Sequence, residues 1–440
     1  MNKIQNIELL NNWKKYTLQE MIDLGIIISH LDGNHGELYP NKEEFVEDGV
    51  PYLSANCIIN GEVDFTKTKF LTQKRADTFI KGVAKNNDLL FAHNATVGPV
   101  AILKTSLDYV ILSTTLTYYR CNSEFLLPEY LRLYMISDFF VHQYELVMKQ
   151  ATRNQVPITK QRTFFHLLPP LPEQQRIVAI LDEAFDAIAR AKANAEQNLK
   201  NARELFESYL QGVFENKGEG WEEKTLEQIS KTFGRGKSKH RPRNDEKLYG
   251  GEYPFIQTGD IRNCDHYITA YTQTYNEAGL AQSKLWPSGS ICITIAANIA
   301  ETGVLTFDAC FPDSVIGLVV NEKLADRDFV EYLLQSFKAK LQALGKGSAQ
   351  ANINMGTFEN ESFPFPSVKE QKSIVQKLDA LSTETKKLEA IYKQKIADLE
   401  ELKKSLLQKA FKGELKSVRE AIDVGGRHNT TDINAAVLNE

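Results

Sequence analysis

The chain has 440 residues, of which 42% are apolar and 25% are charged, a balance typical of folded domains and not of disordered or fibrous chains. No apolar run reaches the roughly 18 residues of a membrane span, and the polar N-terminal residues lack the apolar core of a signal peptide. The net charge of −5 excludes a global positive field, so any nucleic-acid site must be local. The five cysteines have no CxxC spacing, which argues against a zinc site or a disulfide framework and favours the reducing cytoplasm.

An internal repeat organises the sequence. Residues 173–182 recur as residues 370–379, 197 positions further on, and the match continues without a gap as far as Phe214 and Phe411. The repeat indicates that one unit, a globular block followed by a helical segment, is used twice. The predicted domains are 1–168 (first globular block), 169–216 (first helical spacer), 217–365 (second globular block), 366–412 (second helical spacer) and 413–440 (a mobile tail).

The globular blocks are predicted to be rich in β-strands. Residues 89–102 and 290–305 each contain an apolar segment, a polar turn and a second apolar segment, which is the pattern of two adjacent strands. A helix is expected to follow in each block, over residues 128–148 and 328–344. The expected fold class is therefore α+β.

The helical spacers carry the clearest periodicity. Residues 173–211 and 367–412 contain neither Gly nor Pro, and their apolar residues recur at alternating steps of four and three, which is the heptad of a coiled coil. The predicted helix seam comprises Ile177, Leu181, Ile188, Asn198, Leu205, Ile374, Leu378, Leu388, Lys395 and Leu402.

Two of these seam positions are polar. Asn198 and Lys395 occupy the same position of the repeat, and a buried polar residue in a seam fixes the register at a cost in stability. The alternative is that both side chains point outward and that Leu199 and Ile396 fill the seam instead.

Helices of about 40 residues that carry one apolar stripe need a partner to bury it. The two spacers most simply pair with each other in an antiparallel coiled coil. This pairing places one globular block at each end and relates the two copies by a pseudo-two-fold axis. The alternative is that each spacer pairs with another protein.

Catalytic motifs are missing from the sequence. It contains no Asp/Asn-Pro-Pro-Tyr/Phe segment, the motif of an amino-methyltransferase. Gly236-Lys237-Ser238 resembles the end of a phosphate-binding loop, but that motif requires a glycine where this chain has Lys231. No cluster of His, Cys and carboxylates has the spacing of metal ligands. We therefore predict no catalytic and no metal-binding residues.

The strongest local signal for binding is the basic segment 231–243. It holds six Lys and Arg and no acidic residue, although residues 217–365 as a whole hold 16 basic and 19 acidic residues. A concentrated basic loop can bind phosphates, its glycines allow close approach of the backbone, and arginine can read guanine edges. The alternative is an ordinary solvated loop.

The first block has no such segment, so two DNA-binding blocks would use different residues and read different sequences. Its counterpart, residues 31–40, is Gly-rich and mildly acidic, and polar residues in 149–155 and 346–352 precede the spacers. Amides there can pair with adenine edges, or the residues can simply cap or turn into the next strand. The candidate DNA-binding residues are Arg235, Lys237, Lys239, Arg241, Arg243, Asn298, Lys346, Gln350, Asn34, His35, His93, Asn94, Thr96, Arg153 and Asn154.

The sequence as a whole resembles a known family, the specificity (S) subunit of type I restriction-modification systems. The resemblance covers about residues 12–412. Its most specific parts are the proline-Glu-Gln junctions that open the two spacers, 168–178 and 365–375, together with the Trp-x-x-x-x-Leu openings at Trp13 and Trp221. The second junction departs from the first, with Phe-Pro-Phe-Pro in place of Pro-Pro-Leu-Pro.

The resemblance implies a non-catalytic subunit that recognises DNA. Each globular block would be a target recognition domain for one half of a split double-stranded DNA target, and the helices would set the gap between the halves. The helices would also dock two methyltransferase (modification) subunits, which bind S-adenosylmethionine. Restriction subunits that use ATP and Mg²⁺ would join that core, and this chain would bind no cofactor itself. The alternative is a coiled-coil adaptor between proteins, without DNA readout.

Overall fold

The structure is a computed structural model that describes residues 12–33, 39–150, 154–240, 242, 244–296, 299–345, 355–359 and 361–415. The chain divides into two compact units, the first made of residues 1–194 and 395–440 and the second of residues 195–394. Each unit therefore holds one globular block and a part of each long helix. Within the described ranges, none of the helices combines the length and the apolar character needed to cross a membrane. The predicted tail lies outside the described residues from residue 416 onward.

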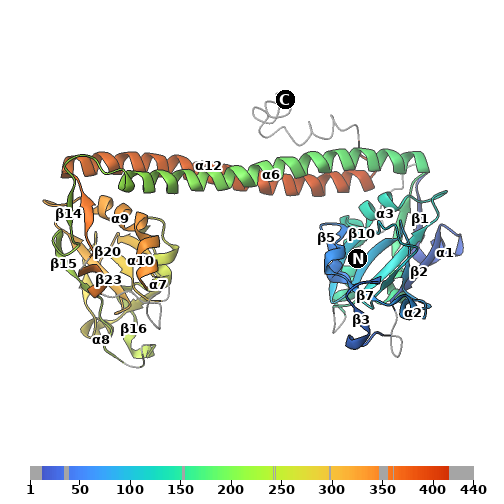
Figure 1. Cartoon of the computed structure of the whole chain (residues 1–440), viewed down its shortest axis with the longest axis horizontal. Coiled ribbons are helices and arrows are strands. Elements are labelled where there is room, and N and C mark those ends of the chain that lie inside the picture. The colour runs from blue at the N-terminus through green and yellow to red at the C-terminus, as the bar shows by residue number, and fades with distance from the viewer. Residues whose placement is uncertain are drawn as a thin grey trace. The chain divides into compact units, whose positions relative to one another are not determined.

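The first unit is built on mostly antiparallel strands, with β4 and β11 as a parallel pair, and has short helices beside them (Figure 1). One sheet has the strand order β10-β9-β12-β2, a second has the order β3-β7-β4-β11-β8, and β1 pairs with β13. The elements are β1 (Lys14–Thr17), α1 (Leu18–Asp23), β2 (Ile27–Asp32), β3 (Phe45–Val46), β4 (Val50–Leu53), β5 (Ile58–Ile59), β6 (Glu62–Val63), β7 (Lys69–Leu71), α2 (Gln73–Ala76), β8 (Val83–Ala84), β9 (Leu89–Asn94), β10 (Thr96–Ile102), β11 (Val110–Leu112), β12 (Leu116–Cys121), α3 (Pro128–Met135), α4 (Asp138–Met148), α5 (Ile158–Gln161), β13 (Phe165–Leu168) and the first part of α6 (Leu171–Glu215).

The second unit repeats this topology. Its sheets have the orders β15-β23-β20-β21-β17 and β18-β16-β22-β19, and β14 pairs with β24. The elements are β14 (Glu222–Lys224), β15 (Ser230–Arg235), β16 (Tyr249–Phe255), α7 (Thr258–Asn263), β17 (Tyr267–Ile268), β18 (Gln273–Tyr275), α8 (Glu277–Ala281), β19 (Leu285–Trp286), β20 (Ile291–Thr294), β21 (Thr302–Leu305), β22 (Ala309–Cys310), β23 (Val315–Val320), α9 (Arg327–Ser336), α10 (Lys338–Gly345), α11 (Met355–Glu359), β24 (Phe363–Phe365) and the first part of α12 (Val368–Phe411).

The strand orders confirm the internal repeat. The order β2-β12-β9-β10 in the first unit corresponds to β15-β23-β20-β21 in the second, and β7-β4-β11-β8 corresponds to β18-β16-β22-β19. Both predicted strand pairs are present, as β9 with β10 and β20 with β21. The α+β fold class is thus confirmed for both units.

The helix predicted after the strands is broken in both units, at equivalent places. The first unit has α3 and α4, and the second has α9 and α10. The Ser137 hydroxyl donates to the carbonyl oxygen of Tyr134 (2.6 Å), and the Ser336 hydroxyl donates to that of Leu333 (2.8 Å). A serine hydroxyl that bonds to a backbone carbonyl competes with the helix ladder. A single helix over either predicted range was therefore wrong.

The glutamine of each Glu-Gln junction joins a long helix to its globular block. The amide oxygen of Gln174 accepts from the backbone N–H of Leu127 (2.9 Å), and that of Gln371 accepts from the N–H of Asp326 (2.7 Å). Their amide nitrogens donate to backbone carbonyls, including that of the proline five residues earlier. Both glutamines are fully buried, and a buried amide needs such partners. The junction motif therefore has a structural role, which the sequence analysis did not assign.

The two long helices run antiparallel within each unit. In the first unit Arg176 donates to the carbonyl oxygen of Leu415 (3.0 Å) and Lys192 pairs with Glu400, so low numbers of α6 meet high numbers of α12. In the second unit the ion pair Arg203–Glu389 (3.0 Å) links the helices in the same sense. This confirms the predicted antiparallel pairing of the two spacers over the alternative of a separate protein partner for each.

Three residues that were predicted to lie in the seam do not lie there. Asn198 is exposed and Leu199 is half-buried, while Leu205 and Leu388 are 51% and 37% exposed. In α6 the inward side chains continue as the buried Ala202, the half-buried Phe206 and the buried Leu210, so that Phe206, one residue later, takes the place predicted for Leu205. A straight helix drifts by about 20° per heptad against a strict 3.5-residue repeat. The end of α6 therefore turns its next residues toward the second globular block.

The remaining predicted seam residues lie in or beside the helix contact. Ile177, Leu181, Ile188 and Leu378 are buried, and Ile374, Lys395 and Leu402 are half-buried. Ile396 is half-buried as well, so Lys395 shares its level of the seam with this neighbour.

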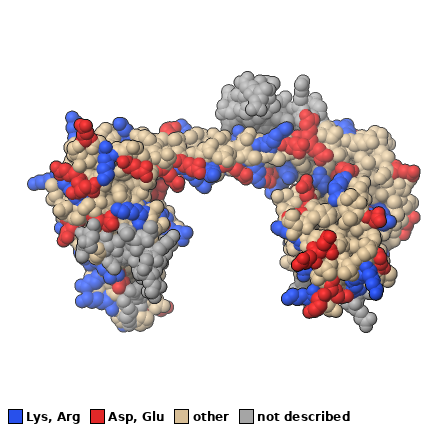
Figure 2. Space-filling model, in the orientation of Figure 1, with Lys and Arg blue, Asp and Glu red and all other residues tan. Residues whose placement is uncertain are grey.

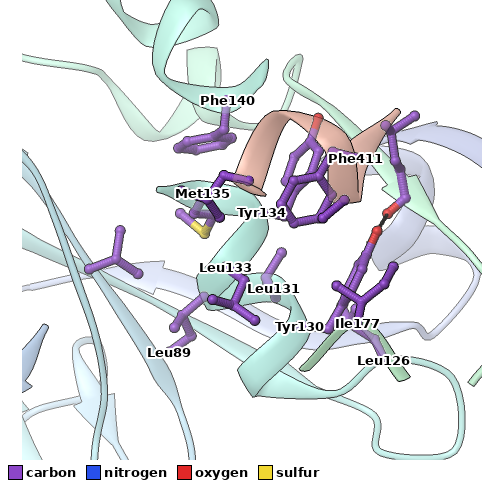
Figure 3. Packing of buried hydrophobic residues seen from close by; sticks show 14 of the residues in the cluster. Leu89, Leu126, Tyr130, Leu131, Leu133, Tyr134, Met135, Phe140, Ile177 and Phe411 are labelled. Carbon is purple, nitrogen blue, oxygen red and sulfur yellow. Dashed lines mark hydrogen bonds between the residues drawn. The ribbon is translucent and has the colours of Figure 1, made fainter. Parts of the chain in front are cut away.

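Each globular core continues into the helix pair. In the first unit Ile177 and Leu181 of α6 and Phe411 of α12 belong to the same buried cluster as Tyr130 and Tyr134 of α3. Figure 3 shows Phe411 lying beside Tyr134, with ring centroids 5.2 Å apart. Burial of aromatic side chains is a major source of stability. The helix ends are therefore part of the core of the globular block and do not merely lie on it.

Candidate nucleic-acid interface

The basic segment begins in β15 and continues along the second unit as a loop held by its backbone. The N–H of Gly236 donates to the carbonyl oxygen of Val315 (2.8 Å), and the Ser283 hydroxyl donates to that of Lys237 (2.7 Å). The amide oxygen of Gln282 accepts from the N–H groups of Lys239 (2.6 Å) and the next residue. The described part of the loop is thus anchored to its own domain at several points.

Buried and exposed residues alternate along this segment. Gly236 and Ser238 are buried, while Lys237 and Lys239 are exposed. Arg235 is exposed too, but its Nε donates to the carbonyl oxygen of Asp313 (2.8 Å). Figure 2 shows Lys and Arg side chains gathered at the end of the second unit near α8 and β16. Lysines on a fixed backbone are suited to phosphate contacts, which position a protein on DNA.

Gly236 has a packing role within its own domain. A Cβ at this position would lie 2.4 Å from the Phe311 ring and from the carbonyl oxygens of Phe311 and Pro312. The glycine therefore allows the basic segment to pack closely on its own domain, while its approach to a phosphate stays a prediction.

His93 is not available to DNA, which corrects its assignment as a contact residue. Its side chain is 1% exposed, and its Nδ1 lies 3.0 Å from the carbonyl oxygen of Val156. It lies on β9, an inner strand of its sheet, whose residues are buried from Leu89 to His93. Because both faces of this strand are covered, a polar side chain there faces the interior.

The structure brings two predicted polar segments of the first unit together. Asn94 and Thr96 flank the turn between β9 and β10, and the N–H of Ala95 donates to the carbonyl oxygen of Asn154 (3.0 Å). Asn94 is half-buried, whereas Thr96 and Asn154 are exposed. These three residues form one polar surface. The other candidates lie outside the described residues, namely Asn34, His35, Arg153, Arg241, Arg243, Asn298, Lys346 and Gln350.

A buried polar network lies in the core of the first unit. The amide oxygen of Gln161 lies 3.1 Å from Nε2 of His30 and accepts from the hydroxyls of Thr117 (3.0 Å) and Tyr119 (2.8 Å). Burial lowers the pKa of His30 to about 3, although its hydrogen bond to Gln161 opposes the shift. Burial also lowers the pKa of His166 to about 4. Both imidazoles are therefore neutral in the folded unit at neutral pH.

The second unit carries a histidine whose pKa is raised instead of lowered. His266 lies 2.6 Å from a carboxylate oxygen of Glu331 and 3.3 Å from one of Asp328. Burial alone would lower the pKa of His266, but these two carboxylates outweigh it and raise the pKa to about 9. His266 is therefore charged at neutral pH and balances two partly or fully buried acids.

We predict that the two units respond oppositely to pH. Between pH 7 and pH 5 the unfolded chain protonates its histidines near pH 6.5 while His30 and His166 stay neutral in the fold. Each then removes about 1.4 kcal/mol of stability per pH unit below 6.5. The contribution of His266 is complete below pH 6.5 and is lost as the pH rises through 9. Hydrogen exchange, corrected for intrinsic rates, should show the first unit opening in acid and the second opening in alkali.

The matched variants are His166→Gln, which should flatten the acid response, and His142→Gln at an exposed position of α4, which should leave it unchanged. The same pH profile for both units in the unaltered protein would contradict the assignment.

The structure also reveals two side chains that the sequence analysis missed. Gln257 and Gln273 lie next to the basic segment, and the amide nitrogen of Gln257 donates to the amide oxygen of Gln273 (2.6 Å). They meet because β16 pairs with β18, with Phe255 opposite Gln273. No spacing in the sequence marks this pair.

Comparison with known proteins agrees with this architecture. A family model described as the type I restriction modification DNA specificity domain matches residues 11–201 and again 218–400. The chain is 24% identical over 428 residues to the putative type I restriction enzyme MjaX specificity subunit of Methanocaldococcus jannaschii, covering 93% of this chain and 95% of that protein. It is 21% identical to the type I restriction enzyme HindI specificity subunit of Haemophilus influenzae, covering 87% and 97% of the two chains.

Solved structures show the same fold. The HsdS subunit from Thermoanaerobacter tengcongensis superposes with a TM-score of 0.62 at 22% identity, covering 93% of this chain and 99% of that one. A chain from a structure that addresses complex assembly and conformational transition of the type I R-M system superposes with a TM-score of 0.76 at 22% identity, covering 93% of this chain and 100% of that one.

Proposed function

We propose, from the fact that this chain belongs to the type I restriction modification DNA specificity family, that it is the subunit that recognises a split DNA target, one half with each globular block. The observation that carries the proposal is that the specificity domain matches twice in one chain, in two units that each have their own core and corresponding strand orders. Their polar surfaces differ, since the second has a basic segment and the first an Asn-Thr turn. Two unlike surfaces on one fold are suited to two unlike half-sequences. A coiled-coil adaptor without DNA readout is not favoured, because both matches are to a DNA specificity domain.

The chain would work inside a restriction-modification assembly in the cytoplasm. Two methyltransferase subunits would dock on its helices and hold S-adenosylmethionine, and restriction subunits would use ATP and Mg²⁺. The chain itself would contribute recognition and no catalytic group. Base flipping of the target adenine into a partner's pocket would cost a few kcal/mol.

An apolar surface on the helix pair supports this docking. Leu205 and Tyr209 of α6 are 51% and 41% exposed, and Leu388 and Ile391 of α12 are 37% and 51% exposed. Each lies one residue before a buried or half-buried position of its helix. In an antiparallel pair these positions fall on the same side. Large apolar side chains gathered on one face are typical of a protein interface.

The direct test is adenine methylation mapped by single-molecule sequencing in cells that carry this chain with its modification subunit. A split motif is expected, and exchange of residues 217–365 for the second block of another specificity chain should change one half of it only. Methylation at a continuous motif, or a change in both halves, would contradict the proposal.

Replacing Lys237 and Lys239 by alanine tests the basic segment. We expect the assembled complex to bind all DNA sequences more weakly, with the slope of log K against log salt reduced by roughly 2, because each phosphate contact contributes a slope of about 0.9. Sequence preference should be retained. Fluorescence anisotropy over a salt series measures both quantities, and Lys323→Ala, at an exposed position in the turn after β23, is the control. An unchanged slope would exclude the segment from the interface.

A further inference from the structure

A cleft with a mixed polar and apolar lining opens beside the basic segment of the second unit. Its volume is about 670 Å³, and its lining includes Ser238, Glu246, Tyr249, Phe255, Gln257 and Gln273. The exposed Lys237 and Lys239 flank Ser238 in the chain, next to the cleft and outside its lining. The cleft and the basic segment beside it therefore offer two kinds of group that DNA recognition requires, namely cations for phosphates and neutral amides for bases.

The wall of the cleft is rigid. The rings of Phe255 and Tyr275 stack with centroids 4.0 Å apart, and Tyr249 packs against both. These aromatic residues belong to β16 and β18, the two strands that carry the wall. The backbone from which the side chains of the cleft project is therefore held in place by this packing.

The two glutamines are oriented by a chain of hydrogen bonds. The Thr272 hydroxyl donates to one carboxylate oxygen of Asp260 (3.1 Å), and the other accepts from the backbone N–H of Gln257 (2.8 Å). The amide nitrogen of Gln257 then donates to the amide oxygen of Gln273. Gln257 is half-buried and Gln273 is exposed. The amide oxygen of Gln273 is thus held by Gln257. The amide nitrogen of Gln273 has two N–H donors, and its side chain is exposed.

This chemistry is suited to base edges rather than to phosphates. Amide side chains form bidentate contacts with the N6 and N7 groups of adenine, and their N–H groups can also donate to the N7 and O6 acceptors of guanine. A neutral amide gains little from a phosphate that neighbouring lysines can bind. An amide held in place by neighbours discriminates better than a mobile one, because less side-chain freedom is lost on binding.

We infer that Gln257 and Gln273 are base-reading residues of the second recognition domain, which contact a purine in one half of the target while Lys237 and Lys239 hold the adjacent phosphates. This inference rests on the proposed function. It assigns base readout to two residues that the pairing of β16 with β18 brings together, and leaves phosphate binding to the basic segment.

The test is the sequence preference of the complete complex, this chain with its modification subunits, measured on a randomised DNA library. Gln273→Ala and Gln257→Ala should each reduce discrimination at one base pair, roughly 5- to 150-fold, the range of one bidentate contact. The relaxed position should lie in the half that belongs to the second domain, and the other half should be unchanged. Gln376→Ala, at an exposed position of α12, is the matched control, and the melting temperature of each variant checks that it folds.

The failures are distinguishable. If the unaltered complex shows no split preference, the proposed function is overturned and this inference with it. If the unaltered complex is selective and both glutamine variants keep its full preference, only this inference is overturned. A uniform loss of affinity for all sequences, with a smaller salt slope, would also overturn it, because that result identifies a phosphate contact.

Discussion

Replacing Phe411 by alanine is expected to destabilise the first unit by about 3–5 kcal/mol, the usual cost of removing a buried phenylalanine from a packed core. The side chain is 1% exposed. Its ring lies 5.7 Å from that of Tyr130, 5.2 Å from that of Tyr134 and 6.4 Å from that of Phe139. Because Phe411 ends α12 while these partners belong to α3 and α4, its loss should weaken the attachment of the helix to the recognition domain as well as the core.

Phe214 provides the matched variant, since it corresponds to Phe411 in the repeat. It lies in the last turn of α6, is 3% exposed, and packs on Phe329 (ring centroids 5.3 Å apart) and Trp221 (6.5 Å) in the second unit. Phe214→Ala should therefore destabilise the second unit and leave the first intact. Urea unfolding followed by hydrogen exchange of peptides from each unit separates the two effects. Leu388→Ala, at a position that is 37% exposed, should change stability little, and equal losses in both units would refute the local assignment.

Inserting one heptad into each long helix, after residues 194 and 394, is expected to lengthen the gap between the two half-sequences. Seven residues add about 10.5 Å of helix, which corresponds to up to about three base pairs at 3.4 Å per base pair. A whole heptad preserves the seam, because its apolar positions return to the same side. Methylation mapping should therefore show both half-sequences unchanged and a longer gap.

The control is the same insertion into one helix only. It moves the seam by a heptad in one of the two units, where it separates either Lys192–Glu400 or Arg203–Glu389, and should abolish selective methylation. If the double insertion keeps the original gap, the helices do not set the spacing.

Two predictions that failed show what a pattern along the chain leaves open. Leu205 matches the heptad as well as Leu181 does, yet it is exposed while Leu181 is buried. The difference arises because α6 contacts the second globular block at its end, so Phe206 and Leu210 face the core there. In the same way His93 belongs to a polar turn by its neighbours in sequence but to the interior by the position of β9 in its sheet.

Periodicity and motifs between near neighbours are enough to predict the repeated architecture, the two long helices, the strand pairs and the family. Which side chains reach the surface, and which distant residues meet, depends on how the folded segments pack. The Gln257–Gln273 pair arises from the pairing of β16 with β18, and the junction glutamines bond to backbone groups about 45 residues away. Exposure and hydrogen-bond partners are properties of packed segments far apart in the chain, and a local pattern does not contain them.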